Sequence, residues 1–134
     1  MADFRVLVTG SRDWTDVPAV YDALNRVLAE HPQRSVVVVH GACSKGADAI
    51  ADHVARDLGL RVERHPADWD SYGKRAGFKR NAEMVALGAA LGLAFILPCT
   101  DPKCRRPGPH GSHGASHCAQ LAEANGIEVR RIDG

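Results

Sequence analysis

The chain has 134 residues, with 17 basic and 16 acidic side chains and a formal net charge of +1. This length suits a single domain over 1–134 with a sizeable core, and the near-neutral charge excludes a global field for gripping nucleic acid or an anionic membrane. The longest apolar stretch, 84–97, is interrupted by glycines and too short to span a bilayer. The first strand-like run begins at Phe4, which leaves no room for a signal peptide. We therefore expect a cytoplasmic protein without a membrane partner.

In chain order, β-branched and apolar runs alternate with segments of helical spacing. The runs predict strands over 4–9, 35–40, 60–65, 91–97 and 127–132. The helical spacing predicts helices over 17–31, 45–58, from 78 or 80 to 87, and over about 116–125. We expect loops at 66–74 and, because of its prolines and glycines, at 99–114.

This alternation predicts the α/β class. Four consecutive valines, Val36–Val39, are typical of a strand that is covered on both faces. We expect a single Rossmann-like, doubly wound domain with a mostly parallel sheet of about five strands and helices on both faces.

Glycine-bearing turns follow the first, second and fourth predicted strands. In open parallel sheets, ligands bind beyond the carboxyl ends of the strands. Glycine lets backbone N–H groups approach an anion, and a following helix adds its positive dipole end. The turns therefore predict a phosphate cradle, with the alternative that glycines merely end strands. The expected ligand contacts in these turns are Gly10, Ser11, Arg12, Asp13, Gly41, Ala42, Lys45, Gly46, Asp48, Gly111, Ser112 and Gly114.

Neither common nucleotide motif is present in these turns. The segment 41–46 lacks the lysine and hydroxyl that follow the second glycine of a P-loop, and no GxGxxG follows the first strand. We therefore exclude a P-loop nucleotidase and an ordinary dinucleotide dehydrogenase, and we identify no organic cofactor. Asp48, in a first helical turn, is expected to serve the helix dipole and its cap.

The segment 72–81 is the one dense basic stretch. Arg80, at a helix start, could fork onto a phosphate, and Asn81 could bond a ribose or a base edge. The remaining cations of the stretch are equally well explained as a solvated loop. Trp14 and Trp69 both fall in loops at the ligand edge, where each either stacks on a base or closes the end of the core.

Four segments in order, 8–14, 41–48, 65–69 and 77–84, resemble the SLOG superfamily and within it the small stand-alone YspA-related proteins. The resemblance implies a Rossmann-like domain that binds nucleotides or their derivatives. Superfamily members include the LOG phosphoribohydrolases, and Arg80 resembles an arginine of those enzymes. In the segment that aligns with their GGxGTxxE loop, 111–118, Cys118 takes the place of the catalytic glutamate. LOG-type activity is therefore disfavoured, because a carboxylate would stabilise the oxocarbenium-like centre.

A Cys/His-rich insert at 98–114 and the residues just after it supply six zinc ligands by type. Tetrahedral zinc needs four thiolate or imidazole ligands, and such a clip would order a loop with little core of its own. We predict a structural Zn²⁺ on Cys99, Cys104, His110 and His113, with His117 or Cys118 as substitutes. The alternative is that the histidines line a polar loop and that Cys118, with Leu121 and Ala122, faces the sheet.

The expected function is binding of a phosphorylated, nucleotide-like small molecule, for signal sensing or sequestration. One alternative is a hydrolase of a nucleotide N-glycosidic or phosphoester bond that uses Arg80, the one catalytic candidate, with Asp13 or Asp48. Another is a single-stranded nucleic-acid or protein-partner module built on 74–80. The missing glutamate argues against the hydrolase, and the near-neutral charge of the chain argues against nucleic-acid binding. Homodimer formation stays open, since 85–91 is apolar enough to allow it.

Overall fold

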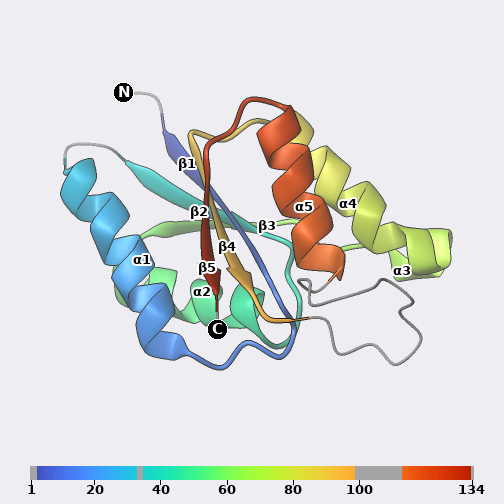
Figure 1. Ribbon diagram of the computed structural model, residues 1–134, viewed down its shortest axis with the longest axis horizontal. Coiled ribbons are helices and arrows are strands. Elements are labelled where there is room, and N and C mark those ends of the chain that lie inside the picture. Colours follow the sequence, from blue (N-terminus) through green and yellow to red (C-terminus); the bar gives the residue numbers. More distant parts are fainter. Residues whose placement is uncertain (1–2, 33–34, 99–112, 134) are drawn as a thin grey trace.

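The computed structural model describes residues 3–32, 35–98 and 113–133, and its centre is one sheet of five parallel strands (Figure 1). The strands run in the order β3-β2-β1-β4-β5. Their bounds are β1 Phe4–Gly10, β2 Val36–His40, β3 Arg61–Arg64, β4 Leu91–Ile96 and β5 Val129–Asp133. The predicted fold class, a Rossmann-like parallel sheet, is confirmed.

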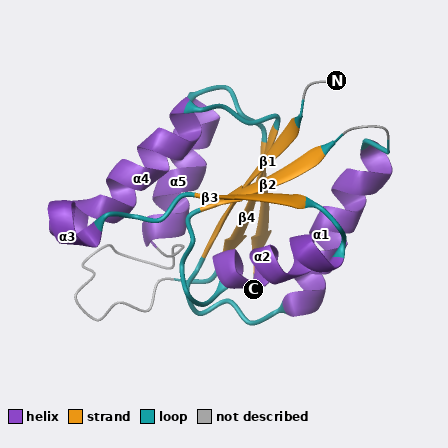
Figure 2. Cartoon of the chain, turned by 180° about the vertical axis from the view of Figure 1, so that it is seen from behind, coloured by secondary structure: helices purple, strands orange, loops and turns teal. Residues whose placement is uncertain are grey.

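Helices cover both faces of the sheet, as the sequence predicts (Figure 2). One face carries α1 (Val17–Glu30) and α2 (Ala47–Asp57), and the other carries α4 (Ala76–Ala86) and α5 (His113–Ala124). A short α3 (Trp69–Tyr72) and a 3₁₀ turn (Gly73–Arg75) lead into α4. Among the described residues, no helix is both long and apolar enough to cross a membrane.

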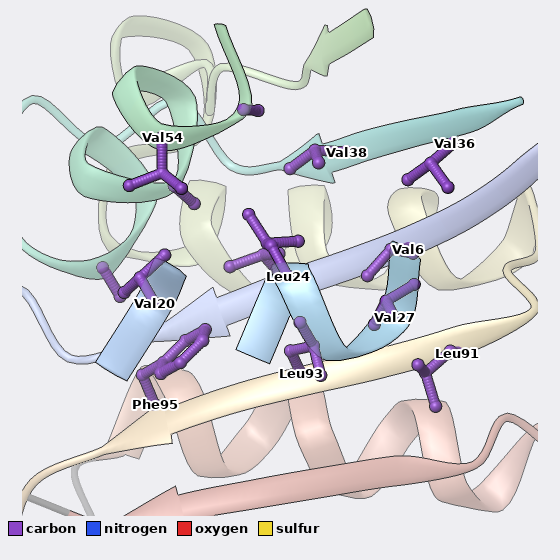
Figure 3. Packing of buried hydrophobic residues seen from close by; sticks show 14 of the residues in the cluster. Val6, Val20, Leu24, Val27, Val36, Val38, Val54, Leu91, Leu93 and Phe95 are labelled. Carbon is purple, nitrogen blue, oxygen red and sulfur yellow. The ribbon is translucent and has the colours of Figure 1, made fainter. Parts of the chain in front are cut away.

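The valine run of β2 divides its side chains between two cores. Val36 and Val38 pack with the α1 and α2 cluster, which includes Leu24 of α1, as Figure 3 shows. Val37 and Val39 pack on the other face with the cluster that contains Met84 and Cys118. A strand that is buried on both faces exposes no polar side, so the run does not alternate between apolar and polar residues.

The expected boundaries differ from the observed ones at several helix starts. Helix α2 begins at Ala47 because Gly46, with φ of 76°, is its N-cap. The loop expected over 66–74 contains α3, whose N-cap Asp68 accepts a hydrogen bond from the Ser71 N–H at 3.1 Å. Helix α4 begins at residue 76, and α5 begins at His113, inside the stretch expected to be irregular.

Candidate functional site

The strand order reverses at β1, which has β2 on one side and β4 on the other. In open parallel sheets this is where loops part and a crevice forms. A cavity of about 330 Å³ lies at this carboxyl edge, between the loops after β1, β2 and β3 and the helix α4. Its lining residues are Arg12, Gly41, Ala42, Cys43, Ser44, Lys45, Pro66, Ala67, Trp69 and Arg80.

A buried histidine at the end of β2 holds the loop over 41–46. His40 is 2 % exposed, and its Nδ1 accepts a hydrogen bond from the Ala42 N–H at 2.9 Å. Its Nε2 therefore carries the proton and donates to Asp52 Oδ2 at 2.8 Å. Ala42 has a φ of 58°, a left-handed conformation that costs energy for any residue with a Cβ. His40 thus fixes a strained turn on the cavity wall.

The Asp52 carboxylate that receives His40 belongs to a charged network on the outside of α2. Arg64 donates to both of its oxygens, at 2.8 and 3.0 Å, and Arg56 donates to one at 2.6 Å. The hydrogen bonds from Arg64, and then those from His40 and Arg56, hold the pKa of Asp52 well below its usual range. Asp52 is therefore ionised at neutral pH, and it keeps the His40 ring oriented.

Asp48 is buried behind the same loop, 6 % exposed, in the first turn of α2. As expected, it is the acidic residue of the first turn, but it does not cap the helix: the N-cap is Gly46, and Asp48 Oδ2 accepts instead from the Cys43 N–H at 3.4 Å. Burial, followed by the charge of Asp48, raises the pKa of the Cys43 thiol. Cys43 is therefore a neutral thiol on the cavity wall, and Asp48 is a loop-holding carboxylate.

Three successive backbone N–H groups lie where the loop over 41–46 meets α2. In the part of the chain that the structure describes, the N–H groups of Ser44, Lys45 and Gly46 donate to no protein acceptor. The following Ala47 N–H donates to the Ser11 carbonyl at 3.1 Å. Unpaired N–H groups at the start of an eleven-residue helix favour a negatively charged guest.

Arg80 reaches from α4 across to this loop. Its Nη1 donates to the Gly41 carbonyl and, at 3.4 Å, to the His65 carbonyl, and its Nε donates to Asn81 Oδ1 at 2.9 Å. A Cβ on Gly41 would lie 2.4 Å from Arg80 Nη1, so a side chain at this position would displace the guanidinium from its present place. Among the described residues, no carboxylate forms an ion pair with Arg80 and its Nη2 donates to no acceptor, so this nitrogen can donate to a ligand in the cavity.

The turn after β1 packs mainly against α2 and the end of β4, and its contacts are with other parts of the protein. A Cβ on Gly10 would lie 2.3 Å from the Ala47 Cβ, and one on Gly46 would lie 2.4 Å from the Ser11 carbonyl oxygen. Ser11 is 5 % exposed, and its Oγ accepts from the Leu97 N–H at 2.8 Å. Gly10 and Gly46 are thus required by close packing between β1, its turn and α2, and this contact positions the α2 N-terminus.

The predicted ligand contacts divide into two groups. The cavity brings together Arg12, Gly41, Ala42, Lys45 and Arg80. Gly10, Ser11, Asp13, Gly46, Asp48 and Asn81 are not among its lining residues. Gly111 and Ser112 lie outside the described residues, and Gly114 lies in the first turn of α5.

Charged and aromatic side chains from the turns after β1, β2 and β3 lie at the exposed opening of the cavity. Lys45 Nζ lies 3.3 Å from Asp13 Oδ1, and both side chains are exposed. The Arg12 guanidinium carbon lies 5.5 Å from the centre of the Trp69 ring.

Trp14, in contrast to Trp69, is only 2 % exposed and packs on Phe95 with ring centres 5.4 Å apart. Of the two alternatives for Trp14, closing the end of the core is the one that its burial supports.

The predicted zinc ligands fall mostly outside the described residues. Cys99, Cys104 and His110 lie there, and His113 is described only as the first residue of α5. No group of three His, Cys, Asp or Glu side chains that could hold a metal occurs within the residues that are described. The zinc site therefore stays a prediction.

The two substitute ligands are described. Cys118 is fully buried against the sheet, as the predicted apolar stripe of the helix requires, and burial raises the pKa of its thiol to about 11. Its neighbour His117 contacts Phe78 edge-on, with ring centres 4.5 Å apart, and its Nδ1 lies 3.4 Å from Asn81 Nδ2. Burial also lowers the pKa of His117.

Sequence reasoning missed part of the cavity wall. Pro66 and Ala67 line it, and neither was expected to do so; Cys43 and Ser44 also line it, within the turn over 41–46 that was expected to hold the phosphate. The signal for Pro66 and Ala67 was their place directly after the third strand, at the same edge as the other turns. No sequence signal joins Gly41 to Arg80, which lie 39 positions apart.

The sheet order and the crevice at its reversal define a Rossmann-like α/β protein with a small-molecule-sized cavity at the carboxyl edge. Residues 4–72, about half of the chain, match the family described as "YspA, cpYpsA-related SLOG family". The chain is also 45 % identical over 130 residues to the "Gene 61 protein" of Mycobacterium phage D29, with 93 % of each chain covered. The chain belongs to the YspA, cpYpsA-related SLOG family, and this membership suggests nucleotide-related binding.

Proposed function

We propose that the protein binds a phosphorylated nucleotide or nucleotide derivative in the cavity at the carboxyl edge, for sensing or sequestration. The observation that carries the proposal is that two positively polarised features, one from α4 and one from the loop over 41–46, meet at the cavity. The guanidinium of Arg80, without a carboxylate partner among the described residues, lies against the loop whose Ser44 and Lys45 N–H groups have no acceptor there. A phosphate fits both, since it accepts charge-assisted hydrogen bonds from guanidinium and backbone N–H alike.

The charges around the cavity support an anionic ligand. Arg12, Lys45 and Arg80 line it, and none of its described lining residues is a carboxylate. Three acidic residues that adjoin the lining segments are already engaged: Asp13 pairs with Lys45, Asp48 accepts from the Cys43 N–H, and Asp68 caps α3. The cavity volume of about 330 Å³ lies at the lower end of the range for small-molecule sites.

The alternative of a nucleotide hydrolase has less support in this geometry. Its candidate carboxylates were Asp13, which is exposed in an ion pair, and Asp48, which does not line the cavity. At the position of the LOG glutamate stands Cys118, a buried thiol whose raised pKa keeps it neutral. Incubation with nucleoside monophosphates, followed by chromatography for released base or phosphate, separates the two functions: intact ligand supports binding alone.

Calorimetric titration with nucleoside mono- and diphosphates and ADP-ribose tests the proposal. Arg80→Gln should weaken the tightest ligand by at least about ten-fold, because it removes charged hydrogen bonds to phosphate. Arg131→Gln is the matched control, since Arg131 pairs with Glu123 on β5 and α5 and does not line the cavity. Thermal unfolding of each variant shows that the fold is kept. Equal affinities of Arg80→Gln, Arg131→Gln and the natural protein would contradict the proposal.

The structural zinc on Cys99, Cys104, His110 and His113 is a separate proposal, supported by ligand type and number. Native mass spectrometry of protein purified without added metal should show one bound zinc. That mass should disappear after chelation and in Cys99→Ser. The same spectra report whether two copies associate. Cytoplasmic location likewise stays a prediction.

A further inference from the structure

Exposed aromatic side chains gather on α3 and α4, beside the cavity. Trp69, Tyr72 and Phe78 are each about half exposed. Each has one polar neighbour: Lys79 Nζ lies 4.9 Å from the centre of the Tyr72 ring, Phe78 contacts His117 edge-on, and the Arg12 guanidinium lies 5.5 Å from the centre of the Trp69 ring. Trp69 is the aromatic residue that lines the cavity. A large indole that is 47 % exposed at a cavity rim needs a reason, because burial would stabilise the fold.

The local structure holds the Trp69 indole in place without burying it. Trp69 is the first residue of α3, directly after the N-cap Asp68. A Cβ on Gly77 would lie 3.2 Å from Trp69 Cη2, so the edge of the indole rests against the α4 backbone at a glycine. The ring is therefore oriented by two backbone elements, which leaves it pre-organised for a partner.

The Arg12 guanidinium beside this ring could contact a ligand without breaking another interaction. Arg12 follows β1, and within the described residues its guanidinium has no carboxylate partner and no hydrogen-bond acceptor. Its contact with Trp69, 5.5 Å from guanidinium carbon to ring centre, is near the outer limit of a cation–π interaction. A planar guanidinium can also stack on a nucleobase.

We propose that the base of the bound nucleotide stacks on Trp69, with the Arg12 guanidinium closing over it. This rests on the proposed function and deepens it: the ligand class becomes a single free nucleotide, recognised by its base as well as by its phosphate. In this arrangement the phosphate takes the Ser44 and Lys45 N–H groups together with Arg80, and the base takes the Trp69 indole, all of which line the same cavity. Stacking tolerates every base, because each has a π-face.

Tryptophan fluorescence is a direct readout, because the two tryptophans differ so much in exposure. Trp14 is 2 % exposed and Trp69 is 47 % exposed, so acrylamide quenches mainly Trp69. A nucleoside monophosphate should quench the acrylamide-accessible emission and protect it from acrylamide. Ribose 5-phosphate, which carries the phosphate without a base, should do neither. Binding of the nucleotide with no change in the accessible emission would overturn the stacking.

Affinities of Trp69 variants separate the base from the phosphate. Trp69→Leu should weaken a nucleoside monophosphate by about ten-fold and leave ribose 5-phosphate unchanged, since only the stack is lost. Trp69→Phe, which keeps a ring, should restore most of the nucleotide affinity. Tyr72→Leu is the matched control, because Tyr72 is equally exposed but does not line the cavity.

The same titrations distinguish the failure of this inference from that of the proposed function. If nucleotide and ribose 5-phosphate both bind, and Trp69→Leu weakens neither or both equally, the base does not stack and the phosphate site stands. If neither binds at all, the proposed function fails first. A 5′-phosphorylated trinucleotide is the last arm: binding no tighter than the mononucleotide supports a free nucleotide, and tighter binding would overturn it.

Discussion

The two tryptophans have the same setting in the sequence and opposite environments in the structure. Each follows an aspartate in a turn at the carboxyl edge of the sheet. Trp14 is buried against Phe95, with its Nε1 donating to the Asp16 carbonyl at 3.0 Å, whereas Trp69 is half exposed at the cavity. The difference arises from the next element in each case: after Trp14 the chain enters α1, which covers the sheet, whereas Trp69 begins the short α3, which has no buried residue.

This contrast extends to the surroundings of the two residues. The Trp14 side is a cluster of apolar side chains that includes Val20, Leu24 and Phe95. The cavity side, comprising the loop over 41–46 with His40, Asp52 and Arg80, is held by hydrogen bonds and ion pairs. Changes on the Trp14 side should therefore alter stability, and changes on the cavity side should alter binding.

The largest expected effect is that of Trp14→Ala. Removing a buried indole should lower the free energy of unfolding by about 3–5 kcal/mol, because the cavity left behind adds to the lost burial. Trp69→Ala should cost less than about 1 kcal/mol, since its ring is half exposed. Urea unfolding of both variants measures the difference, and equal losses would show that the two indoles contribute alike to the core.

Gly10→Ala should have the next largest effect and lower the free energy of unfolding by about 1–3 kcal/mol. Its Cβ would meet the Ala47 Cβ at 2.3 Å and the Phe95 carbonyl oxygen at 2.7 Å, where neither helix nor strand can yield easily. Gly59→Ala is the reference, because its Cβ would meet nothing within 4 Å and only the positive φ of 74° opposes it. We expect about 1 kcal/mol there. A smaller loss for Gly10 than for Gly59 would contradict the close packing of β1 on α2.

Asp16→Ala should lower the free energy of unfolding by about 1 kcal/mol, because it removes the side-chain cap of α1. Asp16 Oδ1 accepts from the Ala19 N–H at 3.0 Å, on the Trp14 side of the molecule. Thermal melting should show the loss, while ligand affinity stays the same. Asp16→Asn, which keeps an acceptor, should restore most of the stability.

The smallest expected effect is the pH response of the ion pair between Glu63 on β3 and Arg5 on β1, neither of which lines the cavity. Hydrogen bonds from Arg5, and then from His65, lower the pKa of Glu63 from 4.5 to about 2. Glu63 therefore stabilises the fold above pH 4.5, and this contribution is lost as the pH falls from 4.5 towards 2. Because the side chain is 36 % exposed, we expect only about 1 kcal/mol. Glu63→Gln should flatten the stability profile in this window, and an unchanged profile would show that the pair contributes nothing.

Much of the fold could be predicted because its signals are local. The four valines of β2 and the strand–helix alternation are properties of neighbouring residues, and both were confirmed. Helix α3 was missed although Asp68 and Ser71 stand at capping distance, because four residues are too few for a hydrophobic period. The start of α5 at His113 was missed because the prolines and glycines before it suggested a longer irregular stretch.

The site was harder to predict, because its contacts join distant parts of the chain. That the glycine turns share one edge is a consequence of parallel strands, and five of the expected residues do line one cavity. What each glycine does could not be predicted, since it depends on neighbours in space: Ala47 for Gly10, Arg80 for Gly41 and Ser11 for Gly46. The bonds from His40 to Ala42 and Asp52 give that histidine a loop-holding role, which a strand-end position does not reveal.

The central claim is that the carboxyl-edge cavity binds a nucleotide, and nuclear magnetic resonance tests it in the natural protein. We would titrate a nucleoside monophosphate into ¹⁵N-labelled protein and follow the amide signals together with both indole N–H signals. We predict that Ser44, Lys45 and the Trp69 indole shift together with a single affinity, while the buried Trp14 indole stays in place. Saturating ligand that moves none of the cavity signals, or moves only signals elsewhere, would contradict the claim.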